Sequence, residues 1–159
     1  FLNHMLEQTA RYAGFGMELT GRGDIEVDEH HLTEDAGIVF GQALSEALGD
    51  RVGIVRFGSA YAPLDEALSR VVIDLCKRPY CEVNDQGKLR GKSGSYAVEN
   101  LVEFFRAFSI HAGATVHVDY IRGRDRHHVA ESMFKALGLA LRDAVFRDGG
   151  GVPSTKGVL

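Results

Sequence analysis

Two copies of the pattern His-His-x-x-Glu hold the residues in this sequence best suited to chemistry. The first copy is His30-His31-Leu32-Thr33-Glu34 and the second is His127-His128-Val129-Ala130-Glu131. Residues three and four apart share one face of a helix, so each histidine could lie beside the glutamate, whereas adjacent histidines point about 100° apart. Imidazole nitrogens with a carboxylate favour Mn, Fe, Co, Ni or Zn. Each histidine pair is therefore better placed to bind two metal ions than one.

The alternative for either copy alone is a pair of solvated histidines at the start of a helix. The similarity between the copies, however, extends well beyond the motif. Gly41, Ala43, Leu44 and Ala47 recur as Gly138, Ala140, Leu141 and Ala144 at the same offset. A repeat of this length favours the ligand role and predicts that the chain consists of two copies of one half-domain.

The repeat also adds two candidate ligands outside the motifs. Ala13-Gly14 matches Ala112-Gly113, and on that alignment His4 lies opposite Glu103. Both residues are able to bind metal, and both precede a predicted sheet. Taken alone, His4 would be a partly buried histidine with an ordinary hydrogen-bond partner. The repeat favours a ligand role for it.

The elements that must position these motifs follow from hydrophobic periodicity. Helices are predicted over residues 1–12, 30–48, 96–111 and 127–146. Strands are predicted over residues 15–20, 24–28, 54–62, 67–76, 80–84 and 114–121, with a polar, glycine-rich loop at 85–95. The order of the elements predicts an α+β fold: a duplicated split-βαβ-like half-domain, with helices packed on one face of a sheet. We expect a single catalytic domain with halves at about 1–84 and 96–148, followed by a substrate-binding tail at 149–159.

Composition and charge argue against several classes of protein. The 159 residues carry a net charge of −4 without a long basic stripe, which argues against nucleic acid as a partner. No apolar run approaches the length needed to span a membrane, so no membrane association is expected. Cys76 and Cys81 are too few for a disulfide framework and favour a reduced compartment. A cytoplasmic location is the expectation.

The sequence resembles the imidazoleglycerol-phosphate dehydratases of histidine biosynthesis along its whole length. The matching blocks, in order, are FLNHML at 1–6, DIEVDEHHLTED at 24–35, RFG at 56–58, PLDEA at 63–67, RPY at 78–80, HHVAE at 127–131, FKA at 134–136 and PSTKGVL at 153–159. The chain departs from the family pattern at Asn3, where the family has Asp, and at Glu103, where it has His. The family's N-terminal strand, with an acidic residue that acts in proton transfer, would precede Phe1, so we expect that segment to be missing here.

The resemblance implies a hydro-lyase that converts imidazole glycerol phosphate to imidazole acetol phosphate, through an imidazolate stabilised by two Mn²⁺ ions per subunit. The metal ligands that it implies are His4, His30, His31, Glu34, His127, His128 and Glu131, with Glu103 as an eighth candidate. The substrate-binding residues that it implies are Gln8, Arg56, Arg78, Lys135, Ser154, Thr155 and Lys156, whose cations and hydroxyls suit a phosphate. It also implies a hollow twenty-four-subunit particle with metals shared between subunits, and a plastid location if the source is a plant or alga.

Two other functional classes remain open at this point. A metal-dependent hydrolase could use His-His-x-x-Glu much as other hydrolases use His-Glu-x-x-His. A non-catalytic metal-binding module could use the same residues for assembly. Ser154 and Lys156 discriminate against the hydrolase, because a peptidase has no need of a phosphate site. Turnover of imidazole glycerol phosphate would exclude the non-catalytic module.

Overall fold

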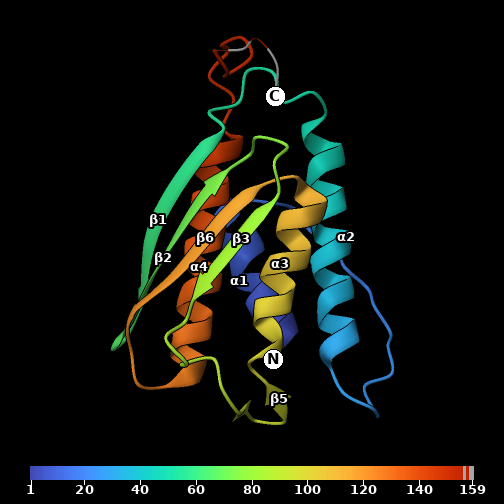
Figure 1. Cartoon of the computed structure of the whole chain (residues 1–159), viewed down its shortest axis with the longest axis vertical. Coiled ribbons are helices and arrows are strands. Elements are labelled where there is room, and N and C mark those ends of the chain that lie inside the picture. The colour runs from blue at the N-terminus through green and yellow to red at the C-terminus, as the bar shows by residue number, and fades with distance from the viewer. Residues whose placement is uncertain (156, 158–159) are drawn as a thin grey trace.

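The computed structural model describes residues 1–155 and 157, which form helices and strands in a mixed order (Figure 1). The helices are α1 (Leu2–Ala13), α2 (His30–Leu48), α3 (Asn100–Ala112) and α4 (Arg126–Val145). The strands are β1 (Phe57–Leu64), β2 (Ala67–Asp74), β3 (Tyr80–Asn84), β4 (Lys92–Ser93), β5 (Tyr96–Ala97) and β6 (Thr115–Arg122). Within the described residues, no helix combines the length and the apolar character needed to cross a membrane.

The main sheet has the strand order β1-β2-β6-β3. Neighbouring strands are antiparallel from β1 to β6, and β3 runs parallel to β6. Every second residue of β2, such as Val71 and Ile73, is buried, and the residues between them are half-buried. This alternation is typical of a sheet that is covered on one face.

The helices supply that cover and join the chain into one core. In Figure 1, α4 lies against β1 and β2, α3 lies against β3, and α1 and α2 pack on α4 and α3 respectively. The rings of Phe104 and Phe105 in α3 lie 5.1 and 5.0 Å from the ring of Phe134 in α4, and all three are fully buried. The expected α+β class, with helices on one face of a sheet, is confirmed.

The two helix pairs meet through equivalent glycine contacts. A Cβ atom on Gly138 of α4 would lie 2.6 Å from the carbonyl oxygen of Thr9 in α1, and one on Gly41 of α2 would lie 2.7 Å from that of Phe108 in α3. Real Cβ atoms do not approach that closely, so glycine is needed at both positions for the helix backbones to touch. Because Gly41 and Gly138 are also equivalent in the sequence repeat, the repeat extends to the packing of the helices.

A buried arginine closes the carboxyl end of α3. Arg51 is only 1% exposed, and its guanidinium donates hydrogen bonds to the carbonyl oxygens of Gly113 and Ala112 and to the Oγ of Ser45. Burial lowers its pKa, and no ion pair with a carboxylate is formed within the described residues. The positive charge is instead stabilised by the helix end, where the last carbonyl groups have no helical partner and the dipole is negative.

The predicted strands at 15–20 and 24–28 are wrong, because both segments are irregular. Their alternation of apolar and polar residues indicates a half-buried face, but a strand also needs a neighbour for its backbone hydrogen bonds. Neither segment pairs with a strand of the described sheets, and Ile25 and Val27 are 61% and 71% exposed. The other strands and the helices were predicted correctly to within a few residues, except that β4 and β5 replace part of the expected loop and the start of the helix at 96.

Candidate metal centre

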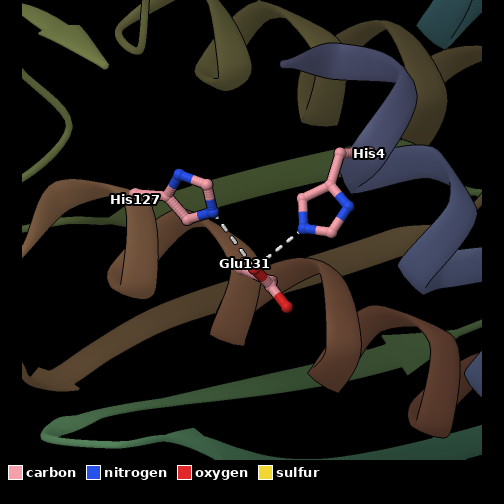
Figure 2. A group of neighbouring side chains, drawn as sticks. All are labelled: His4, His127 and Glu131. Atoms are coloured by element: carbon pink, nitrogen blue, oxygen red, sulfur yellow. Dashed lines mark hydrogen bonds and ion pairs between the residues drawn. The ribbon is translucent and has the colours of Figure 1, made fainter. Parts of the chain in front are cut away.

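Helices α1 and α4 bring three candidate ligands together. His4 Nε2 lies 3.0 Å from Glu131 Oε2, and His127 Nε2 lies 3.2 Å from the same oxygen. Figure 2 shows the two rings approaching the carboxylate from different helices. One ligand atom from each residue falls within 4.8 Å of the others, which makes this the one metal-capable cluster found in the described part of the chain.

Local sequence explains this geometry. Asp125 caps the start of α4, where its side chain accepts hydrogen bonds from the backbone N–H groups of His127 and His128. His127 and Glu131 are four residues apart and so share one face of the helix. The close approach at Gly138 holds α1 against α4, which brings His4 to the same face. The cluster therefore depends on a cap, a helical spacing and one glycine contact.

The carboxylate of Glu131 is held in its charged form. Burial opposes its ionisation, but hydrogen bonds from Lys135 and His4 outweigh burial, so the pKa of Glu131 lies below its ordinary value. Lys135 Nζ lies 2.8 Å from Glu131 Oε1, so this candidate substrate-binding residue is paired with a candidate ligand. Gln8, another candidate for binding substrate, is half-buried one helical turn after His4.

His128 is not part of the cluster and contacts a carboxylate from the β1–β2 hairpin. Its Nδ1 lies 2.8 Å from Glu66 Oε2, while Glu66 Oε1 accepts hydrogen bonds from the backbone N–H groups of Arg124 and Asp125. The hydrogen bond from the backbone N–H of Asp125, then that from the ring of His128 and that from the backbone N–H of Arg124, lower the pKa of Glu66 to about 2. The hydrogen bond to Glu66 raises the pKa of His128. The two adjacent histidines thus point to different partners, as their spacing predicts.

Among the residues that the structure describes, the first motif does not assemble a second cluster. His31 Nδ1 lies 3.2 Å from Asp24 Oδ2, which raises the pKa of His31, and the ring is 64% exposed. His30 and Glu34 are half-buried in the first turns of α2. Glu103 Oε1 accepts a hydrogen bond of 2.7 Å from Arg106, and it lines a pocket of about 440 Å³ together with His30. Glu103 is therefore near the first motif but paired with a cation.

The candidate phosphate-binding residues lie elsewhere. Arg56 forms a two-pronged ion pair with Asp74, at 2.6 and 2.9 Å, and donates a third hydrogen bond to the carbonyl oxygen of Pro153. Arg78 is 72% exposed and lies 3.9 Å from the same aspartate. Ser154 and Thr155 follow Pro153 in the tail, and Lys156 lies outside the described residues.

The metal-capable cluster and the pair of arginines therefore lie at opposite ends of α4. His127 and Glu131 are in its first turns, whereas the backbone N–H of Arg56 donates to the carbonyl oxygen of Ala144 near its end. Figure 1 shows the start of α4 at the bottom and the tail at the top. The helix has 20 residues and spans about 30 Å. One small substrate cannot reach both groups of a single chain.

Comparison with known proteins identifies the family. The model of the imidazoleglycerol-phosphate dehydratases matches residues 1–141. The chain belongs to this family. Dehydratases from Paraburkholderia phytofirmans and Halorhodospira halophila are 51% and 50% identical to it over the whole chain, which covers 83% and 82% of their lengths. As a family member the chain is a hydro-lyase that acts on imidazole glycerol phosphate in histidine biosynthesis.

Solved structures of the dehydratase have the same fold. The crystal structure from Staphylococcus aureus has a TM-score of 0.84 and 43% identity, and the match covers 92% of this chain and 83% of that one. The structure from Pyrococcus furiosus has a TM-score of 0.82 and 37% identity, covering 99% and 85% respectively. This chain therefore resembles the solved dehydratases both in sequence and in fold.

Sequence reasoning missed three carboxylates that hold the predicted residues in place. Glu66 binds His128, Asp24 binds His31, and Asp74 binds Arg56. Glu66 was visible only as part of the PLDEA block, with no spacing that links it to a histidine. Its role follows from the hairpin, which brings it beside the start of α4.

Proposed function

We propose that this dehydratase binds two Mn²⁺ ions per subunit and uses them to dehydrate imidazole glycerol phosphate. The observation that carries the proposal is the cluster of His4, His127 and Glu131, whose ligand atoms lie within 4.8 Å of one another. Two imidazole nitrogens and one carboxylate oxygen form a ligand set that suits Mn²⁺. Three protein ligands on a six-coordinate ion also leave positions open for substrate. The residues present therefore fit the metal.

The remaining candidates would complete the coordination. His30, His31, Glu34 and His128 have ring nitrogens or carboxylate oxygens near the surface, and Glu103 is a further candidate. Bound Mn²⁺ would supply Lewis acidity to the substrate imidazole, so that loss of a C–H proton and of hydroxide becomes accessible. Lys135, which contacts Glu131, and Gln8, one helical turn after His4, would orient the substrate.

We infer that each catalytic site also draws on a second copy of the chain. The cations that suit the phosphate, Arg56 and Arg78, lie at the far end of α4 from the cluster. One subunit would then bind the phosphate of the substrate, and another subunit would bind its imidazole ring. This arrangement favours an oligomer with shared sites, and we propose the twenty-four-subunit particle that the sequence resemblance implies.

The proposal is tested by metal analysis beside a dehydratase assay. We expect about two Mn²⁺ per chain, turnover of imidazole glycerol phosphate, and loss of bound metal in His127→Ala but not in His117→Ala, which changes an exposed histidine outside the candidate set. Chelation should reduce the particle to smaller species in light scattering, and added Mn²⁺ should rebuild it.

Other outcomes would favour the rival functions. Metal binding without dehydration would favour the assembly module, and hydrolysis of a peptide or ester would favour the hydrolase. An unchanged particle size after complete chelation would refute metal sharing between subunits.

Lys156→Ala should raise KM by roughly ten- to a hundred-fold, because a charge-assisted contact to the phosphate is lost. The amount of bound metal should not change.

A further inference from the structure

The second histidine of each motif binds a carboxylate through the same ring nitrogen. His128 Nδ1 lies 2.8 Å from Glu66, and His31 Nδ1 lies 3.2 Å from Asp24. In both rings Nε2 forms no hydrogen bond within the described residues. A carboxylate can only accept a hydrogen bond, so the neutral ring carries its hydrogen on Nδ1 and keeps a lone pair on Nε2. That lone pair is what a metal ion needs.

The two carboxylates do not derive from the internal repeat. Asp24 precedes its histidine by 7 residues in one loop, whereas Glu66 precedes its own by 62 and belongs to a hairpin. The residue equivalent to Asp24 in the second half is Ile121, which has no polar side chain. The same nitrogen has therefore acquired a carboxylate partner from unrelated positions.

Other contacts at the two motifs do follow the repeat. Asp28 Oδ1 accepts from the backbone N–H of His30, and Asp125 Oδ1 accepts from that of His127, both at 2.7 Å and both two residues upstream. Inherited contacts thus occupy equivalent positions. The contrast indicates that the carboxylate at Nδ1 is retained for its effect on the ring.

We propose that Glu66 and Asp24 are positioning residues that hold Nε2 of His128 and His31 available for metal. The proposal rests on the proposed function, since it assumes that these histidines bind the ion. A carboxylate behind a ligating imidazole fixes its tautomer and orientation, and losing one typically weakens metal binding by about 10- to 100-fold. Glu66 holds its ring more firmly than Asp24, because its other oxygen is anchored by two backbone N–H groups.

Glu66→Gln separates positioning from simple attachment of the hairpin. The amide oxygen of the glutamine must face the two backbone N–H groups, which can only donate. Its NH₂ group must then face His128 Nδ1 and donate to it. The ring proton would move to Nε2, which blocks the metal-binding lone pair while the hairpin stays attached. Glu46→Gln is the matched control, because Glu46 is exposed on α2 and has no side-chain partner within the described residues.

The experiment measures the tautomer and the metal affinity separately. Nitrogen-15 NMR of the histidine-labelled, metal-free protein, at a pH where the rings are neutral, should show His128 protonated on Nδ1 in the native protein and in Glu46→Gln. In Glu66→Gln it should be protonated on Nε2. Calorimetric titration with Mn²⁺ should then give binding weakened about 10- to 100-fold in Glu66→Gln only.

Each contrary result has a distinct meaning. If the native protein binds no Mn²⁺, the proposed function fails. If it binds Mn²⁺ and Glu66→Gln binds it equally tightly, the positioning role is refuted, whichever tautomer is seen. If Glu66→Gln does not fold, Asp24→Ala provides a second test in an exposed loop, because it removes the carboxylate behind His31 and should weaken Mn²⁺ binding through that ring. An unchanged affinity there would overturn the proposal.

Discussion

Glu131 and Lys135 provide a quantitative test of how the candidate metal centre is held when no metal is bound. The two side chains are 10% and 14% exposed and lie 2.8 Å apart. Glu131→Gln keeps the shape but removes the charge, and it replaces one acceptor oxygen by an NH₂ group that donates. The imidazoles of His4 and His127 can exchange donor and acceptor roles and so adapt to the amide. Lys135 cannot adapt, because an ammonium group only donates.

The magnitude follows from replacing the charged oxygen that faces Lys135 by a neutral amide oxygen. A hydrogen bond to a charged group contributes about 1.5–3 kcal/mol, and a neutral one about 0.5–1.5 kcal/mol. Exchanging one for the other, and leaving Lys135 without a counter-charge, should reduce the free energy of unfolding by about 2 kcal/mol. In Lys135→Met, by contrast, the apolar side chain can fill the same space. The double variant Glu131→Gln with Lys135→Met should therefore be about 1–2 kcal/mol more stable than the sum of the two single effects predicts.

The assay is urea denaturation followed by circular dichroism, at pH 8 with a chelator and at one protein concentration. The fixed concentration matters because association of subunits adds to apparent stability. Additive effects of the two substitutions would refute the reasoning, since they would mean that the pair is not coupled. A Glu131→Gln protein as stable as the native one would refute it too.

Three further predictions concern the scaffold. Arg51→Met should lower the free energy of unfolding by about 2–4 kcal/mol in urea denaturation, because the buried carbonyl groups at the end of α3 lose their donors. Gly58→Ala should cost about 3 kcal/mol or prevent folding, since its Cβ would overlap the carbonyl oxygen of Ala140, whereas Gly16→Ala, with nothing within 4 Å, should be nearly neutral. Burial raises the pKa of the Cys81 thiol to about 12, so roughly one molecule in 10⁴ is ionised at pH 8 and iodoacetamide should react at least about 100-fold faster after unfolding. Because the thiol ionises at a lower pH in the unfolded protein than in the folded one, the free energy of unfolding should fall as the pH rises above about 9. Rapid alkylation of the native protein would contradict the assigned burial of Cys81.

The sequence was most informative where periodicity and burial agree. Helices α2 and α4 have clear apolar faces and were predicted almost to the residue, and β3 was predicted at its observed bounds. The strands at 15–20 and 24–28 failed because alternation describes only the side chains. It carries no information on whether another strand lies alongside to accept the backbone hydrogen bonds.

In the candidate site, too, local spacing was predictable from the sequence and tertiary contacts were not. The grouping of His127 with Glu131 follows from helical spacing, and the repeat alignment pointed to His4. Contacts between distant elements were not predictable in this way. The partner of His128 comes from a hairpin 62 residues away, and that of Arg56 from the next strand, so each depends on the tertiary fold.

The position of the two residue groups at opposite ends of α4 has a genetic consequence. In the proposed assembly, a chain that is inactivated by a substitution at His127, at the start of α4, keeps an intact Arg56 near the end of that helix. A chain that is inactivated at Arg56 keeps its histidines intact. Two such inactive alleles expressed together would form mixed particles in which some sites combine the intact ends of both. Complementation between alleles should therefore follow the ends of this helix: pairs damaged at opposite ends restore growth without histidine, and pairs damaged at the same end do not.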